Sequence, residues 1–221
     1  MGVLIIRVLR VAVAALGAAA VITALVTSRG TVANFVSFFT IESNILAIVV
    51  LAVGGVRDPR AERWAYFRGA VTLYMVITGI VYAALLSTVD VELPAPWTNS
   101  VLHQVLPILI LVDWLFLPPW TRSSRARALA WLAFPLVYFA YSLIRGPVAH
   151  FYPYPFLDPR PHGYDHVIVY AIVLAIGMAV LALLVHRIAA QRLASAARQD
   201  DVEARPRPGS GDRPPVRRRT R

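Results

Sequence analysis

Hydrophobic residues gather in long runs along this chain, and short clusters of charged residues and prolines separate the runs. Each run is about 20 residues long, the length at which an α-helix crosses a hydrocarbon core of ~30 Å. The pattern predicts an all-α, polytopic membrane protein with a six-helix transmembrane domain over residues 1–188. The six expected spans are 8–28, 34–54, 68–88, 98–117, 127–145 and 165–187.

Arginines are divided unevenly between the expected connections on the two sides of the membrane. Most of them lie in the N-terminal segment and in the second and fourth connections, namely Arg7, Arg10, Arg57, Arg60, Arg63, Arg68, Arg122, Arg125 and Arg127. The other connections carry Arg29, Arg145 and Arg160. By the positive-inside rule we expect both termini to be cytoplasmic and the loop around Asp90 and Glu92 to face outward, in a multi-pass protein of the cell membrane.

The composition excludes a water-soluble globular domain, because 58% of the 221 residues are hydrophobic and only 15% are charged. All 22 basic residues are arginines, and the chain has no cysteine. Without lysine, Schiff-base and P-loop chemistry are excluded. Without cysteine, disulfides, thiolate nucleophiles and cysteine zinc sites are excluded. We expect no cofactor.

From residue 189 onward the apolar pattern gives way to Arg, Pro, Gly and Asp, which cannot bury a core. We therefore predict a disordered, Arg/Pro-rich cytoplasmic tail over residues 189–221. Much of the net charge of +10 lies at the end of this tail. Its basic residues predict attraction to anionic lipid headgroups and no nucleic-acid partner.

Polar residues within the spans lie mainly in the outer halves, and they are candidates for a functional site because such groups are costly in lipid. Helical spacing places them on one face of each of four spans. These faces carry Ser37, Thr40 and Asn44; Tyr74, Thr78 and Tyr82; Asn99 and His103; and Tyr138, Ser142 and Arg145. A bundle that turns these faces inward would form one polar pocket, open to the outer leaflet, above an aliphatic inner half. Asp113 is the exception, because it lies deeper than the others.

Thr40 and His103 are expected at similar depths, and together they have the elements of a hydrolase site. A hydroxyl becomes a nucleophile when a base removes its proton, and histidine is the usual base at neutral pH. The simpler alternative is that Thr40 bonds to the carbonyl four residues earlier and that His103 is a buried hydrogen-bonding residue. Glu42 lies on another face of its helix, and we expect it to pair with Arg145 or with a histidine.

Two further segments lie near the start of the sixth span. HGYDH places His162 and His166 four residues apart, with Asp165 beside the second. This pattern fits a zinc or iron site, but the more ordinary interpretation is a helix start near Tyr164, with Asp165 at the positive end of the helix dipole and no bound metal. The aromatic segment FYPYPFLD is expected either to cover the pocket or to form a plain interfacial belt.

Four segments occur in order over nearly the whole chain before the tail: FFTIESNILA, LHQVLPILILVDW, WLAFPLVYFAYSLIRG and FYPYPFLDPRPHGY. They resemble a family of small bacterial six-span membrane proteins of unassigned activity. More distantly, they are similar to the androgen-induced and androgen-dependent transmembrane proteins of eukaryotes, threonine hydrolases that act on fatty acid esters of hydroxy fatty acids. The resemblance implies that Thr40 is the nucleophile and His103 its partner. The chain departs from the family pattern where His103 precedes Pro107 by four residues instead of five, and where Glu42 comes one place early.

The residues and the resemblance together predict an intramembrane hydrolase of lipid esters, in which Thr40 attacks the ester carbonyl and His103 acts as base and then as acid. The expected substrate-binding residues are Asn44, Tyr82, Asn99, Ser142, Arg145 and His166. One alternative is a non-enzymatic protein that binds or transports a small lipid-soluble ligand, and another is a metal-dependent enzyme built on HGYDH. The expected partners are membrane lipids and a lipid ester or another apolar small molecule.

Overall fold

The computed structural model describes residues 1–87, 95–117, 119 and 124–203, and every regular element within them is helical. Six segments are long and apolar enough to cross a membrane: Gly2–Thr27, Phe39–Val56, Glu62–Leu86, Pro96–Phe116, Arg125–Ala149 and Pro159–Ser195. The predicted all-α fold with six spans is thus confirmed. Asp90, Glu92 and Arg122 lie outside the described residues, and the orientation of the bundle in the membrane stays a prediction.

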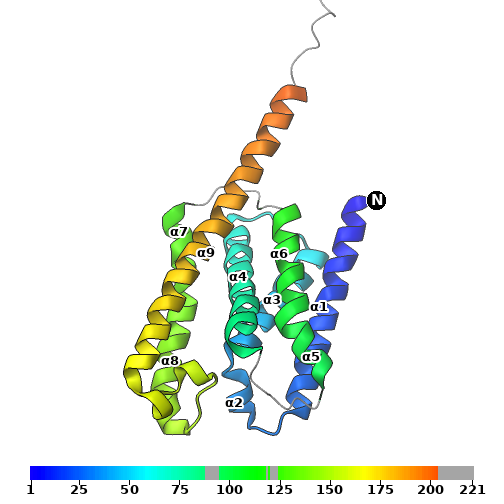
Figure 1. Cartoon of the computed structure of the whole chain (residues 1–221). Helices are drawn as coiled ribbons and strands as arrows, with labels where there is room; N and C mark the ends of the chain where they lie inside the picture. Colours follow the sequence, from blue (N-terminus) through cyan, green and yellow to red (C-terminus); the bar gives the residue numbers. More distant parts are fainter. Residues whose placement is uncertain (88–94, 118, 120–123, 204–221) are drawn as a thin grey trace, which may run out of the picture.

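The helices lie side by side in one bundle, with the N-terminus and the last part of α9 at the same end (Figure 1). We call this the upper end, and the opposite end, with α2 and the α8–α9 connection, the lower end. The elements are α1 (Gly2–Thr27), α2 (Val32–Val36), α3 (Phe39–Val56), α4 (Glu62–Val81), η1 (Tyr82–Leu86), α5 (Pro96–Ser100), η2 (Val101–Val105), α6 (Leu106–Phe116), α7 (Arg125–Leu129), η3 (Ala130–Leu132), α8 (Ala133–Ala149), η4 (Pro155–Leu157) and α9 (Pro159–Glu203). Of these, η1 and η2 are π-helical, and η3 and η4 are 3-10 helical.

The second span is broken near its lower end. The hydroxyl of Ser37 donates to the carbonyl oxygen of Asn34 at 2.7 Å and closes α2. Phe38 is then extended, with φ −81° and ψ 127°, and α3 starts at the next residue. The prediction of one continuous helix over 34–54 is therefore wrong at this point. Thr40 lies in the first turn of α3 and not deeper within a longer helix.

Several helices extend beyond the apolar runs, because polar residues of the connections join their terminal turns. α4 begins at Glu62, where the sequence predicted a start at 68, and α8 continues to Ala149. In α9 the backbone of Gly163 is non-helical, with φ 78° and ψ 172°, a conformation that favours glycine. The regular helix therefore runs from Tyr164, as the sequence predicted.

The last helix also continues past the predicted start of the tail. α9 extends to Glu203, so the prediction of disorder from residue 189 does not hold for the first part of that segment. Residues 189–198 are mainly Ala, Arg, Leu and Gln, which have high helix propensity. A segment with few large apolar residues has no face to bury against the bundle, but it can still form a helix. Residues 204–221 lie outside the described residues.

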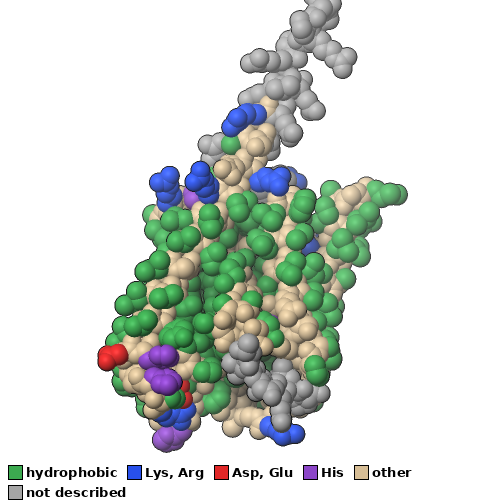
Figure 2. Space-filling view, in the orientation of Figure 1, with side chains coloured by type: hydrophobic (Ala, Val, Ile, Leu, Met, Phe, Trp, Pro, Cys, Tyr) green, Lys and Arg blue, Asp and Glu red, His purple; other side chains and the backbone are tan. Residues whose placement is uncertain are grey.

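Two clusters of buried hydrophobic side chains hold the bundle together. One joins α1, α3, α4 and α6 and includes Met75 and Leu106, and the other joins α4, α8, α9 and η4 and includes Trp131 and Phe156. Hydrophobic side chains also cover the face shown in Figure 2, while arginines gather at its upper end. Ile176 of α9, for example, is 61% exposed. A hydrophobic exterior of this kind is what contact with lipid chains requires.

Candidate ligand-binding site

A cavity of about 280 Å³ lies in the lower half of the bundle, between α3, α4, α8, α9 and the segment that joins α8 to α9. Its wall is formed by Phe39, Thr40, Ile77, Thr78, Val81, Leu86, Pro135, Leu136, Tyr138, Phe139, Tyr154, Phe156, Leu157, Ala171, Ile172, Leu174, Ala175 and Met178. None of these described wall residues is charged. Because most of them are aliphatic or aromatic, the cavity offers mainly apolar contacts to a ligand.

Two hydroxyl groups on the cavity wall are hydrogen-bonded to each other. Thr40 Oγ1 and Tyr154 Oη lie 3.1 Å apart, and the backbone N–H of Thr40 also donates to Tyr154 Oη at 3.1 Å. The N-cap of α3 is Phe38, whose side chain makes no capping hydrogen bond, so the Tyr154 hydroxyl satisfies a helix-end donor instead. The positive end of the α3 dipole and the two hydroxyls therefore meet on one part of the wall.

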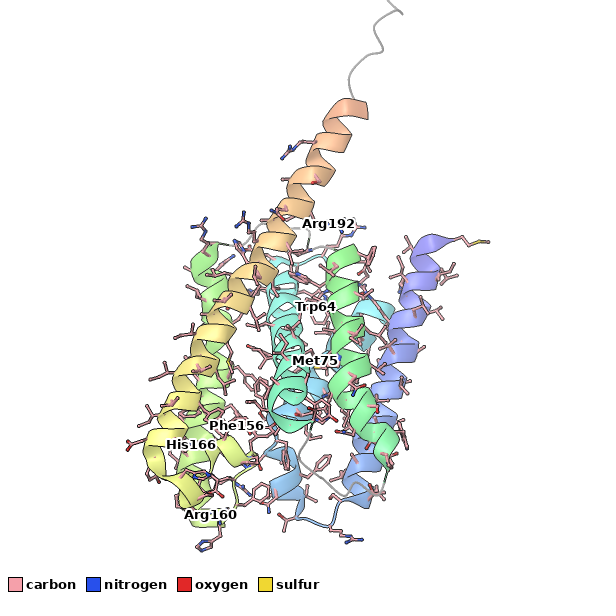
Figure 3. The ribbon with its side chains drawn as sticks, in the orientation of Figure 1. Trp64, Met75, Phe156, Arg160, His166 and Arg192 are labelled. Carbon is pink, nitrogen blue, oxygen red and sulfur yellow. The ribbon has the colours of Figure 1, made fainter. Side chains whose placement is uncertain are left out.

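Tyr154 reaches this position because its segment folds back into the bundle. Tyr154 and Phe156 are each 8% exposed, and their rings stack with centroids 5.2 Å apart and an interplanar angle of 3°. Phe38 packs edge-on against Tyr154 at 5.7 Å. In Figure 3, Phe156 lies between the α8–α9 pair and α4. Of the two expectations for the aromatic segment, the structure agrees with the one in which it covers the pocket.

Burial also fixes the protonation of this tyrosine. Desolvation raises the pKa of Tyr154 to about 12, even though its hydrogen bonds with Thr40 lower it. The phenol is therefore protonated at neutral pH: it can donate a hydrogen bond as well as accept the one from the Thr40 N–H, and it cannot act as a base.

Helix α4 adds a further hydroxyl to the wall. Thr78 is 4% exposed, and its Oγ1 has no hydrogen-bond partner among the described residues. Leaving a buried hydroxyl unpaired costs about 1–3 kcal/mol. A ligand that brings a hydroxyl or carbonyl group into the cavity would find an unsatisfied partner there.

His103 is not hydrogen-bonded to Thr40 and belongs to a different cluster. Its Nδ1 lies 3.1 Å from the carbonyl oxygen of Asn99, and its ring stacks on that of Tyr82 at 4.4 Å. Asn99 Nδ2 donates to Tyr82 Oη at 2.7 Å, so these three residues, from α5, η1 and η2, form a separate cluster. None of them belongs to the cavity wall. In the described part of the chain, no hydrogen bond joins Thr40 and His103.

Asn44 and Ser142 are buried but take no part in the cavity wall. Asn44 Nδ2 donates to the carbonyl oxygens of Thr40 at 2.8 Å and of Leu102 at 3.1 Å. Both amide hydrogens are thus engaged, one within α3 and the other in tying α3 to η2, and they are not free to bind an oxyanion. Ser142 is 2% exposed and lies on α8 outside the wall.

The expected pairing of Glu42 is wrong. Arg145 Nη2 donates to Asn34 Oδ1 at 2.6 Å, and its Nη1 to Ser37 Oγ at 3.5 Å. The break after α2 places these two acceptors beside Arg145, whereas Glu42 lies on another face of α3. Within the described residues, Glu42 Oε2 is buried without a hydrogen-bond partner.

The HGYDH segment lies behind the cavity wall. The His166 ring is 4.9 Å from that of His162 and 4.8 Å from that of Tyr170. Tyr170 in turn stacks on Phe156 at 5.9 Å, which links the segment to the wall. Across the described ranges, no three His, Cys, Asp or Glu residues are grouped as metal ligands would be.

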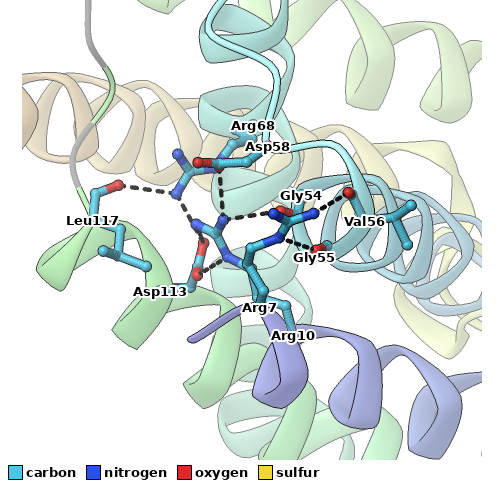
Figure 4. A network of polar contacts seen from close by, with 9 residues as sticks. All are labelled: Arg7, Arg10, Gly54, Gly55, Val56, Asp58, Arg68, Asp113 and Leu117. Atoms are coloured by element: carbon cyan, nitrogen blue, oxygen red, sulfur yellow. Dashed lines mark hydrogen bonds and ion pairs between the residues drawn. The ribbon is translucent and has the colours of Figure 1, made fainter. Parts of the chain in front are cut away.

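The upper half contains a cluster of charged side chains that the sequence indicated only in part. Asp113 accepts hydrogen bonds from Arg10 Nε at 2.6 Å and from Arg68 Nη2 at 2.8 Å, and Arg10 also pairs with Asp58 at 3.1 Å (Figure 4). The sequence singled out Asp113, but it assigned both arginines to the ends and connections of the spans. The signal that could have found them is the aspartate itself, since a carboxylate inside a span needs a cation at its depth.

Comparison with known proteins identifies no relative of this chain. No protein-family model, no curated protein and no solved structure matches this chain. The assignment of a function therefore depends on the geometry of the cavity and on the sequence itself.

Proposed function

We propose that this integral membrane protein binds a lipid-soluble small molecule with one hydrocarbon chain and one uncharged polar group. The observation that carries the proposal is the cavity of about 280 Å³, which combines an apolar wall with the Thr40–Tyr154 pair of hydroxyls. Its volume lies just below the usual range for ligand pockets, roughly 300–1,000 Å³. That size favours a single chain over a two-chain phospholipid.

The polar groups indicate the kind of head that the ligand carries. Tyr154 is a protonated donor, and the hydroxyl of Thr40 is both donor and acceptor. An alcohol, an ester or an amide would pair with them. A charged head would have no counter-ion among the described wall residues, and burying it would be costly.

Filling part of the cavity should weaken binding. The probe is a straight-chain 1-alkanol with a photoreactive diazirine on its chain, added to the protein in lipid vesicles. Ala175→Phe places a ring inside the wall, and each methylene that it excludes costs about 0.8 kcal/mol of binding free energy. Excluding two methylenes lowers affinity roughly fifteenfold. We expect specific photolabelling of α4, α8 and α9 in the original chain and a loss of about this size in the variant.

The matched control is Val173→Phe on the same helix, because Val173 is 62% exposed and does not line the cavity. Its labelling should equal that of the original chain. Equal labelling of both variants, or labelling spread over all lipid-facing surfaces, would contradict the proposal.

A second candidate function is hydrolysis of a lipid ester by Thr40. It is favoured by the position of the Thr40 hydroxyl on the cavity wall and at the N-terminal turn of α3, where the helix dipole would stabilise an oxyanion. The resemblance to the threonine hydrolases also supports it. Its weakness is the missing base, because Tyr154 is protonated and His103 belongs to another cluster. We therefore rank binding above hydrolysis.

Labelling with a fluorophosphonate separates the two functions, since only an activated hydroxyl reacts with it. Under the binding proposal, the original chain, Thr40→Ser and Thr40→Ala should all stay unlabelled while the alkanol probe labels the original chain. Labelling that is present in the original chain and in Thr40→Ser, but lost in Thr40→Ala and His103→Ala, would instead establish a hydrolase. Thermal melts of each variant show whether the fold is retained.

A further inference from the structure

The cavity wall is thin between α8 and α9. Leu136 of α8 and Ile172 of α9 both line the cavity, yet they are 53% and 55% exposed at the surface of the bundle. A side chain that contacts both the cavity and the exterior leaves no second layer of atoms behind it. The two residues lie within spans, so the exterior at this point is the hydrocarbon region of the membrane.

Hydrogen bonds attach each of the two helices beside this thin wall to another part of the protein. α8 is tied to α2 by Arg145 and Asn34, and its Tyr138 hydroxyl donates to the Ser37 carbonyl oxygen at 3.0 Å. α9 is tied to α6, where Trp114 Nε1 donates to the Val185 carbonyl oxygen at 3.3 Å. Within the described residues, no hydrogen bond, ion pair or ring contact joins α8 to α9.

We propose that the ligand enters and leaves this cavity sideways, from the hydrocarbon region of the membrane, through an opening between α8 and α9 whose rim is formed by Leu136 and Ile172. The inference rests on the binding function proposed above and adds the route and the source of the ligand. A hydrocarbon chain passes from lipid to an apolar cavity without crossing water, and separating two apolar side chains breaks no hydrogen bond. The ligand is therefore a molecule already dissolved in the membrane.

A sideways opening predicts how the binding affinity depends on the length of the ligand's hydrocarbon chain. While the chain lies inside the cavity, each added methylene should strengthen binding by up to about fourfold. A chain longer than the cavity can extend through the opening into lipid, so the affinity should level off. In a closed cavity the same longer chains would collide with the wall, and the affinity should fall.

The absence of cysteine allows a direct test, because the only thiols are those introduced. The double variant carries Leu136→Cys and Ile172→Cys, and a bismaleimide with a reducible spacer joins the two thiols. The diazirine alkanol is then added to vesicles that contain this protein, and the rate of photolabelling is measured. The rate of cavity labelling should fall by about tenfold or more on cross-linking and recover when the spacer is reduced. Leu136→Trp with Ile172→Trp narrows the same opening without a cross-link and should also slow labelling.

The control joins two exposed positions away from the opening, Leu16→Cys on α1 and Ile108→Cys on α6, which are 39% and 59% exposed. Cross-linking this pair should leave the rate unchanged. An unchanged rate with the 136–172 cross-link, while the uncross-linked protein is labelled normally, would overturn the sideways route and leave the binding function standing. If the uncross-linked protein is not labelled at all, the binding function itself fails and the route fails with it.

Discussion

Replacing Asp113 by alanine is expected to lower the free energy of unfolding by about 3–5 kcal/mol. The side chains of Arg10 and Arg68 are each 8% exposed, and Asp113 is the carboxylate that both contact. Its removal leaves two guanidinium groups in the interior of the bundle with the more exposed Asp58 as the remaining carboxylate, paired with Arg10. The change is measured by reversible unfolding of the purified protein in mixed detergent micelles.

The matched control is Glu62→Ala, which breaks an ion pair with Arg127 whose side chains are 54% and 55% exposed. Water screens that ion pair, so the free energy of unfolding should change by no more than about 0.5 kcal/mol. If Asp113→Ala unfolds at the same denaturant concentration as Glu62→Ala, the buried charged cluster does not stabilise the upper half of the bundle.

Gly55→Ala is expected to lower the free energy of unfolding by about 1–3 kcal/mol, because it forces α1 and α3 apart. A Cβ at this position would lie 2.7 Å from Val11 Cγ2 and 2.8 Å from the Arg7 carbonyl oxygen. The second contact is to backbone, which cannot rotate away. Moving α1 away from α3 would also strain the hydrogen bond that Arg7 Nε donates to the Gly55 carbonyl oxygen at 2.8 Å.

An identical substitution at Gly177 serves as the comparison, since an added Cβ there meets nothing within 4 Å. Replacing a helical glycine by alanine at an open position adds up to about 1 kcal/mol of helix propensity. The two variants should thus shift the unfolding midpoint in opposite directions. A neutral Gly55→Ala would mean that α1 and α3 are less closely packed than their contacts indicate.

The number and type of the helices could be predicted from the sequence because lipid forces backbone groups to bond within a helix and side chains to be apolar for about 20 residues. The break at Phe38 could not be predicted in the same way. Phe38 is an apolar residue within an apolar run, with no proline or glycine beside it. Its extended conformation is stabilised by contacts with Phe151 and Tyr154, which belong to a connection more than 100 residues away.

The candidate site could be predicted in part. Polar residues in four spans predicted a polar pocket, whereas Thr40 lies on the wall of a cavity whose other residues are mostly aliphatic or aromatic. Depth along a helix, however, does not fix the direction in which a side chain points. The sequence placed His103 level with Thr40, but in the structure η2 presents its ring to Tyr82. The partner of Thr40 instead comes from the aromatic segment, whose folding into the bundle depends on tertiary packing.

The length of α9 alters what its C-terminal residues can reach. Arg192 lies near the level at which the other helices end (Figure 3), and α9 continues to Glu203, about 16 Å further along its axis at 1.5 Å per residue. Electrostatic attraction to a lipid surface decays over a screening length of ~8 Å in physiological salt. The last described turn of α9, at Glu203, therefore lies about two screening lengths beyond the level of Arg192, where attraction to a surface at that level is already weak.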